Sequence, residues 1–114
     1  MALERAVVTG GAGFIGSHLA EELASRGYNV VIFDDLSTGK MENVQRFLTR
    51  GKIEFVHGSV TDFPLLVRSL RGATYVFHLA AIGSVGRSIV DPLTSHQTNA
   101  TGTLNVLVAA KENR

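Results

Sequence analysis

A glycine-rich loop near the start of the chain restricts the possible folds more than any other feature. The stretch from Val7 to Leu19 is VVTGGAGFIGSHL, with glycines at positions 10, 11, 13 and 16. A β-branched run precedes the glycines, and Ile15, Leu19 and Leu23 follow at helical spacing. Such a loop lets backbone N–H groups approach a phosphate closely, where a Cβ atom would be in the way. The pattern therefore predicts a phosphate-binding turn between a strand and a helix.

The rest of the chain alternates between apolar runs and helical patterns. Strands are predicted at 6–8, 29–33, 53–56 and 74–79, and helices at 14–26, through the forties, at 62–72 and from 91 to the end. This alternation indicates a parallel sheet with right-handed crossovers. The predicted fold class is α/β, a Rossmann-like doubly wound parallel sheet of about four strands in the order 3-2-1-4, with flanking helices.

Size, charge and composition exclude several classes of function. The chain has 114 residues, enough for one domain, and a net charge of +1 gives no electrostatic basis for binding nucleic acid or an anionic membrane. It has no cysteine, and its four histidines fit no local metal motif, so no metal ligand is assigned. Its apolar runs are shorter than the roughly 20 residues that span a bilayer, and no signal segment opens it. We expect a cytoplasmic protein without a membrane partner.

An aspartate closes the second predicted strand. Asp34 follows Gly16 by 18 residues, at a place where a carboxylate accepts hydrogen bonds from the ribose hydroxyls of a dinucleotide. Asp34 and Asp35 together would repel a 2′-phosphate, which favours NAD over NADP as the cofactor. The alternative interpretation is a tight turn followed by an ordinary aspartate at a strand end.

Five segments resemble the extended short-chain dehydrogenase/reductase family, in particular its NAD-dependent epimerases and dehydratases. They are TGGAGFIGSHL at 9–19, DDLSTG at 34–39, GSVTD at 58–62, HLAA at 78–81 and NATGTLN at 99–105. The resemblance covers essentially the whole chain. It implies that residues 1–114 are the N-terminal half of an NAD-binding Rossmann domain, and that the full-length protein is a nucleotide-sugar epimerase acting on a UDP-hexose.

The resemblance also implies which residues hold NAD. The glycine loop would line the pyrophosphate, the segment from Asp34 would surround the adenosine, and the ends of the third and fourth strands would edge the adenine and the nicotinamide ribose. The implied residues are Gly10, Gly13, Phe14, Ile15, Gly16, Asp34, Asp35, Leu36, Ser37, Thr38, Gly39, Ser59, Val60, Leu79, Ala80, Ala81 and Thr98. Structural alternatives are that Val60 is ordinary core and that Ala80 and Ala81 let a strand end pack closely. Asp62 fits a helix N-cap better than an adenine contact.

Two positions depart from the family pattern. Relatives commonly carry Asp where this chain has Ser59, and the UDP-galactose-converting epimerases carry Lys or Gln near Gly83. A serine implies a weaker or water-mediated adenine contact, and a glycine offers no side chain to the sugar.

The family's proton transfer uses a Tyr with a Lys four residues later on the same helix face. Tyr28 and Tyr75 are followed at that spacing by Ile32 and Leu79, so no catalytic residue is assigned. We expect the chain to be inactive alone, whether it is a deliberate truncation, a proteolytic fragment or a shortened gene product. The alternatives are a non-catalytic NAD sensor and one half of a split enzyme, which a neighbouring gene supplying Tyr and Lys would reveal. Other family activities, such as dehydration or reduction, stay open.

The fourth predicted strand would form an apolar sheet edge with unpaired backbone groups. Such edges pair with other chains, and the last helix would also expose apolar surface. The pattern therefore predicts a homo-oligomer assembled through the fourth strand or the last helix.

Overall fold

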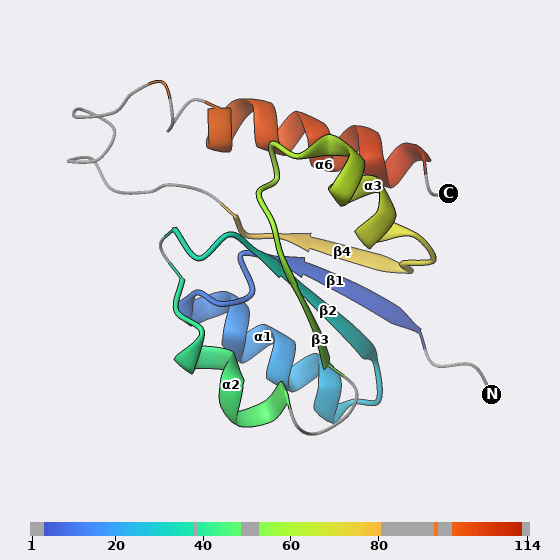
Figure 1. The fold of residues 1–114 in the computed structure, drawn as a ribbon. Coiled ribbons are helices and arrows are strands. Elements are labelled where there is room, and N and C mark those ends of the chain that lie inside the picture. The colour runs from blue at the N-terminus through green and yellow to red at the C-terminus, as the bar shows by residue number, and fades with distance from the viewer. Residues whose placement is uncertain (1–3, 38, 49–52, 81–92, 94–96, 113–114) are drawn as a thin grey trace.

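The structure is a computed structural model that describes residues 4–37, 39–48, 53–80, 93 and 97–112 (Figure 1). Within these residues one parallel sheet is formed, in the order β3-β2-β1-β4. Its strands are β1 (Arg5–Thr9), β2 (Asn29–Asp34), β3 (Ile53–His57) and β4 (Tyr75–His78). The predicted order 3-2-1-4 is confirmed, and all four strands end at the same edge of the sheet because they are parallel.

Helices cover both faces of the sheet, as Figure 1 shows. Helices α1 (Phe14–Ser25) and α2 (Glu42–Leu48) lie on one face, and α3 (Phe63–Leu70) and α6 (Gly102–Glu112) lie on the other. A π-helical turn, η1 (Gln97–Thr101), leads into α6. The helix start predicted at residues 91 and 92 lies outside the described residues.

The N-terminus of α3 confirms one structural alternative from the sequence. Asp62 is the N-cap, and its Oδ1 accepts a hydrogen bond from the Leu65 N–H at 3.2 Å. Pro64 follows in the first turn, where its missing N–H costs nothing. Asp62 is therefore a helix cap, as predicted.

Alternation along the strands divides the core into two layers. In β1, Ala6 and Val8 belong to the cluster beneath α1, whereas Val7 belongs to the cluster beneath α3 and α6. All three side chains are fully buried, as expected for an interior strand of a sheet covered on both faces. Thr9 follows Val7 by two residues and therefore faces the α6 side.

No helix in the described part of the chain has the length and apolar character needed to cross a membrane.

Candidate functional site

The loop between β1 and α1 contains two glycines that the fold itself requires. Gly10 has a φ of +71°, and a Cβ there would lie 2.8 Å from the backbone nitrogen of Ala80. A Cβ on Gly16 would collide with the carbonyl oxygen of Gly10. Both neighbours are backbone atoms, so neither can rotate away. Gly13 differs, because its Cβ would meet only the Gly10 carbonyl oxygen, at 3.3 Å.

The N-terminus of α1 is open toward this loop. Gly13 is the N-cap and provides no side-chain hydrogen bond, and no acidic residue lies in the first turn. Phe14 and Ile15 begin the helix with exposed fractions of 77% and 69%. The first N–H groups of a helix have no partner within it, and they carry the positive end of the helix dipole. This end of α1 therefore offers donors and positive potential to an anion.

Asp34 ties the glycine loop to the segment that follows β2. Its carboxylate is buried, with Oδ2 accepting from the Ala12 N–H at 2.9 Å and Oδ1 accepting from the Leu36 N–H at 2.7 Å. Each carboxylate oxygen has a second lone pair. Asp34 therefore holds the loop in place and keeps acceptor capacity for a further donor.

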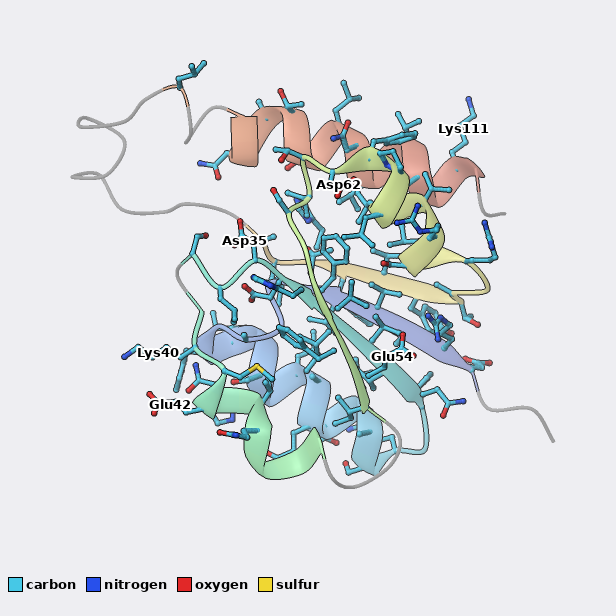
Figure 2. The ribbon with its side chains drawn as sticks, in the orientation of Figure 1. Asp35, Lys40, Glu42, Glu54, Asp62 and Lys111 are labelled. Atoms are coloured by element: carbon cyan, nitrogen blue, oxygen red, sulfur yellow. The ribbon has the colours of Figure 1, made fainter. Side chains whose placement is uncertain are left out.

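A second set of contacts, absent from the sequence prediction, holds the same loop. The Ala12 carbonyl accepts from the Lys40 N–H at 3.0 Å and from Asn43 Nδ2 at 2.7 Å. Gly39 packs against Ala12 so closely that a Cβ would lie 2.8 Å from its carbonyl carbon. Figure 2 shows Lys40 just before α2 and Glu42 at its start. An alanine gives no sequence signal for such a role, because only its backbone takes part.

A cleft opens at the carboxyl edge of the sheet. Its lining consists of Gly10, Gly13, Phe33, Asp34, Asp35, Ser37, Gly58, Val60, Leu79 and Ala80. All except Phe33 and Gly58 are residues that the sequence assigned to the cofactor. The tertiary structure thus brings together segments that follow four different strands, because parallel strands present their carboxyl ends on one side.

The other assigned residues lie around the cleft or outside the described part of the chain. Leu36 and Gly39 contact Asp34. Ser59 accepts from the Thr61 N–H at 3.1 Å and shares a hydroxyl hydrogen bond with that residue. Val60 lines the cleft and is also only 3% exposed within the core, so its structural alternative holds as well. Thr38, Ala81 and the side chain of Thr98 lie outside the described residues, as do Gly83 and His96.

A row of polar side chains stands beside the cleft on the α6 face of the sheet. Thr9 Oγ1 lies 2.7 Å from His78 Nδ1, and His78 Nε2 lies 2.9 Å from Thr103 Oγ1. Burial lowers the pKa of His78 below its ordinary value. Further along α6, Asn105 Nδ2 donates to the Val60 carbonyl at 3.0 Å. In the described part of the chain no group of His, Asp and Glu residues could hold a metal ion.

Comparisons with known proteins agree with this geometry. Residues 7–114 match a family model described as GDP-mannose 4,6 dehydratase. The chain is 41% identical over 109 residues to a UDP-glucose 4-epimerase of Mycolicibacterium smegmatis, covering 94% of this chain and 34% of the relative. It is 39% identical over 107 residues to UDP-glucuronic acid decarboxylase 4 of Arabidopsis thaliana, covering 94% of this chain and 23% of the relative.

A solved structure gives the same result in three dimensions. The UDP-glucose 4-epimerase from Brucella ovis in complex with NAD superposes with a TM-score of 0.84 at 38% identity, covering 97% of this chain and 33% of that one. The chain thus spans about a quarter to a third of the length of the proteins that it matches.

Proposed function

Because this chain belongs to the NAD-dependent epimerase/dehydratase family of extended short-chain dehydrogenases, we propose that residues 1–114 form the NAD-binding part of a nucleotide-sugar epimerase such as UDP-glucose 4-epimerase. The chain spans only a fraction of the length of its relatives. The epimerase activity of the full-length protein, with a UDP-hexose as substrate, is therefore part of this proposal. A cytoplasmic location stays a prediction.

The observation that carries the proposal is the cradle formed by the glycine loop. Gly10 and Gly16 are glycines because the fold has no room for a Cβ. At Gly13 the fold leaves nearly enough room, so the close approach of a ligand is the better reason for a glycine there. A pyrophosphate on the open N-terminus of α1 fits this cradle, with Phe14 and Ile15 supplying backbone N–H groups. Gly13 would line the pyrophosphate without donating to it, because its N–H already donates to the Gly10 carbonyl at 3.1 Å.

The acidic side of the cleft supports NAD over NADP. Asp34 keeps free lone pairs for ribose hydroxyls, and Asp35 lines the same cleft. A 2′-phosphate would meet two carboxylates and no basic side chain among the lining residues. We assign Ser37, Ser59 and Val60 to the adenosine end, and Leu79 and Ala80 to the nicotinamide ribose side.

Residues 1–114 alone are proposed to bind NAD without catalysing a reaction. They hold no Tyr followed four residues later by Lys, the pair that the family resemblance implies for proton transfer. The reaction of the full-length protein is open among family activities, since the relatives include decarboxylases as well as epimerases. An NAD sensor and a split enzyme stay as the alternatives.

Calorimetric titration of the 114-residue chain tests the binding proposal. We expect saturable heat with NAD and at least about tenfold weaker binding of NADP, equal to about 1.4 kcal/mol. AMP should compete with NAD and nicotinamide mononucleotide should not, because Asp34 anchors the adenosine end. No heat at millimolar NAD would remove the cofactor role altogether.

Self-association is a separate proposal that rests on exposed apolar side chains. Strand β4 lies at the sheet edge in the described residues, with Tyr75 45% exposed, and Leu104 and Leu107 on α6 are about 60% exposed. Surfaces of this kind are commonly covered by another chain. Sedimentation velocity should show a dimer or larger species whose fraction rises with concentration. A clean monomer at high concentration would contradict the proposal.

A further inference from the structure

The hydrogen-bond row through Thr9, His78 and Thr103 joins three elements beside the cleft. Thr9 and His78 are paired residues at the ends of β1 and β4. Thr103 lies in the first turn of α6, on the helix that covers this face of the sheet. None of the proposed cofactor contacts uses these three side chains, so the row needs an explanation of its own.

The direction of the hydrogen bond at Thr9 follows from its other partners. The N–H groups of Leu79 and Ala80 lie 3.0 and 3.2 Å from Thr9 Oγ1. A backbone N–H can only donate, and a hydroxyl has two acceptor sites and one hydrogen. Both acceptor sites are therefore used, and the hydroxyl hydrogen is left for His78 Nδ1. This nitrogen must then carry no proton.

The other end of the row selects the same state of the imidazole. Thr103 Oγ1 lies 2.6 Å from the carbonyl oxygen of Asn99, which can only accept. The single hydrogen of this hydroxyl goes to that carbonyl, so Thr103 accepts from His78 Nε2. With the proton on Nδ1 instead, the contact between His78 Nε2 and Thr103 would contain no hydrogen. The contact between His78 Nδ1 and Thr9 would then contain two. An imidazolium would bring a third donor to Thr9.

The row ends on the wall of the cleft. Thr9 holds the N–H groups of Leu79 and Ala80, and its own carbonyl also accepts from Leu79 at 3.0 Å. The same segment passes Gly10 at a distance that excludes a side chain there. We propose that His78, as the neutral tautomer with its proton on Nε2, is a positioning residue that fixes the Leu79–Ala80 wall against the glycine loop and couples this wall to α6.

Because the hydrogen-bond row requires a neutral imidazole, protonation of His78 at low pH should loosen the Leu79–Ala80 wall. Besides Thr9 and Thr103, the neighbouring side chains on this face of the sheet are apolar: Val7 on β1, Phe33 on β2 and Val76 on β4.

In the described part of the chain, no charged group of the packed elements forms an ion pair with His78. Arg5 lies at the opposite end of β1, Arg68 lies in the last turn of α3, and Lys111 lies at the far end of α6 (Figure 2). The acids at the cleft are Asp34 and Asp35. Burial lowers the pKa of His78 below its ordinary value of 6.5, so the neutral row is complete near neutrality and is lost as pH falls through this lowered pKa.

Nuclear magnetic resonance of the chain tests the tautomer without any ligand. Long-range ¹H–¹⁵N correlation at pH 8 should show His78 with Nε2 protonated and Nδ1 bare. Amide hydrogen exchange at Leu79 and Ala80 should be slow, and Thr103→Val should speed it by about tenfold through loss of one hydrogen bond. Thr101→Val, at an exposed position in η1, is the matched control and should leave the exchange rates of Leu79 and Ala80 unchanged. A proton on Nδ1, or unchanged exchange in Thr103→Val, would overturn the inference.

A second arm rests on the proposed NAD site and measures the pH dependence of binding. The NAD affinity of the native chain should weaken as the pH falls from 8 to 5.5, by up to about tenfold, which is the limit for a group whose pKa lies below its ordinary value of 6.5. His78→Asn places an amide oxygen near the position of Nδ1 but cannot titrate, so its affinity should be nearly independent of pH. If His78→Asn keeps the full pH dependence, the positioning role is wrong. If the native chain binds no NAD at pH 8, the proposed function fails, while the tautomer and the exchange rates still decide the role of His78.

Discussion

Replacing Gly16 with alanine is expected to destabilise the chain by roughly 2–4 kcal/mol and to abolish NAD binding. The new Cβ would collide with the carbonyl oxygen of Gly10 and would lie 2.9 Å from its carbonyl carbon. Both atoms belong to a backbone turn that Gly10 holds at positive φ beside the Leu79–Ala80 wall. The turn must therefore move away from α1, and the cradle moves with it. Urea denaturation followed by circular dichroism gives the loss of stability.

Gly13→Ala is the matched comparison for this variant. Its Cβ would meet one atom at 3.3 Å, and its backbone is extended at φ −78°, so stability should fall by no more than about 1 kcal/mol. Binding of NAD should nevertheless weaken by at least about tenfold, because the methyl group would occupy the approach to the pyrophosphate. If Gly13→Ala binds NAD like the native chain, the pyrophosphate does not lie on this cradle. Equal stability of Gly16→Ala and the native chain would contradict the steric argument.

Removing the carboxylate of Asp34 should reduce stability and NAD binding about as much as Gly16→Ala does. Asp34→Ala leaves the N–H groups of Ala12 and Leu36 without their acceptors, and hydrogen bonds to a charged group contribute about 1.5–3 kcal/mol each. We expect a loss of stability of about 2–5 kcal/mol and no measurable NAD binding. Asp34→Asn keeps the shape and one acceptor oxygen but turns an NH₂ group toward one of the donors. It should lose about half as much stability.

The control for Asp34→Asn is the same change at Asp62. Asp62 is exposed, lies outside the cleft, and caps α3, where asparagine is as good an N-cap as aspartate. Asp62→Asn should therefore keep both stability and NAD affinity. Thermal unfolding and NAD titration of both variants give the comparison. If Asp34→Asn matches the native chain in both measurements, the carboxylate neither holds the loop nor contacts the ribose.

The parts of the fold that the sequence predicted are those that depend on local spacing. The strand order followed from the alternation of apolar runs and helical segments, because parallel crossovers of one hand leave few arrangements. Asp62 was predicted as a cap because an N-cap contacts the third residue after it, within the same segment. Ile15 shows the limit of such patterns: it has helical spacing with Leu19 and Leu23, yet it is 69% exposed at the mouth of the loop.

Most of the residues that line the candidate cleft were also assigned from the sequence. Gly10, Asp34, Val60 and Leu79 were each placed by a short motif or by the family resemblance, and all four line one cleft. The family resemblance supplied what spacing could not, since nothing local relates Val60 to the glycine loop. The assignments of individual residues to NAD stay predictions until binding is measured.

The amino-acid sequence alone was enough to place the glycine loop, the aspartate after the second strand and the order of the sheet, because each depends on residue types at short, regular spacing. It could not show that Ala12 is held by Asp34 and Asn43, or that His78 stands between two threonines. Thr9 and His78 are 69 residues apart and Thr103 is 25 further on. The sequence does not show which group a hydroxyl or an imidazole will contact, because only the folded backbone brings the two groups within hydrogen-bond distance.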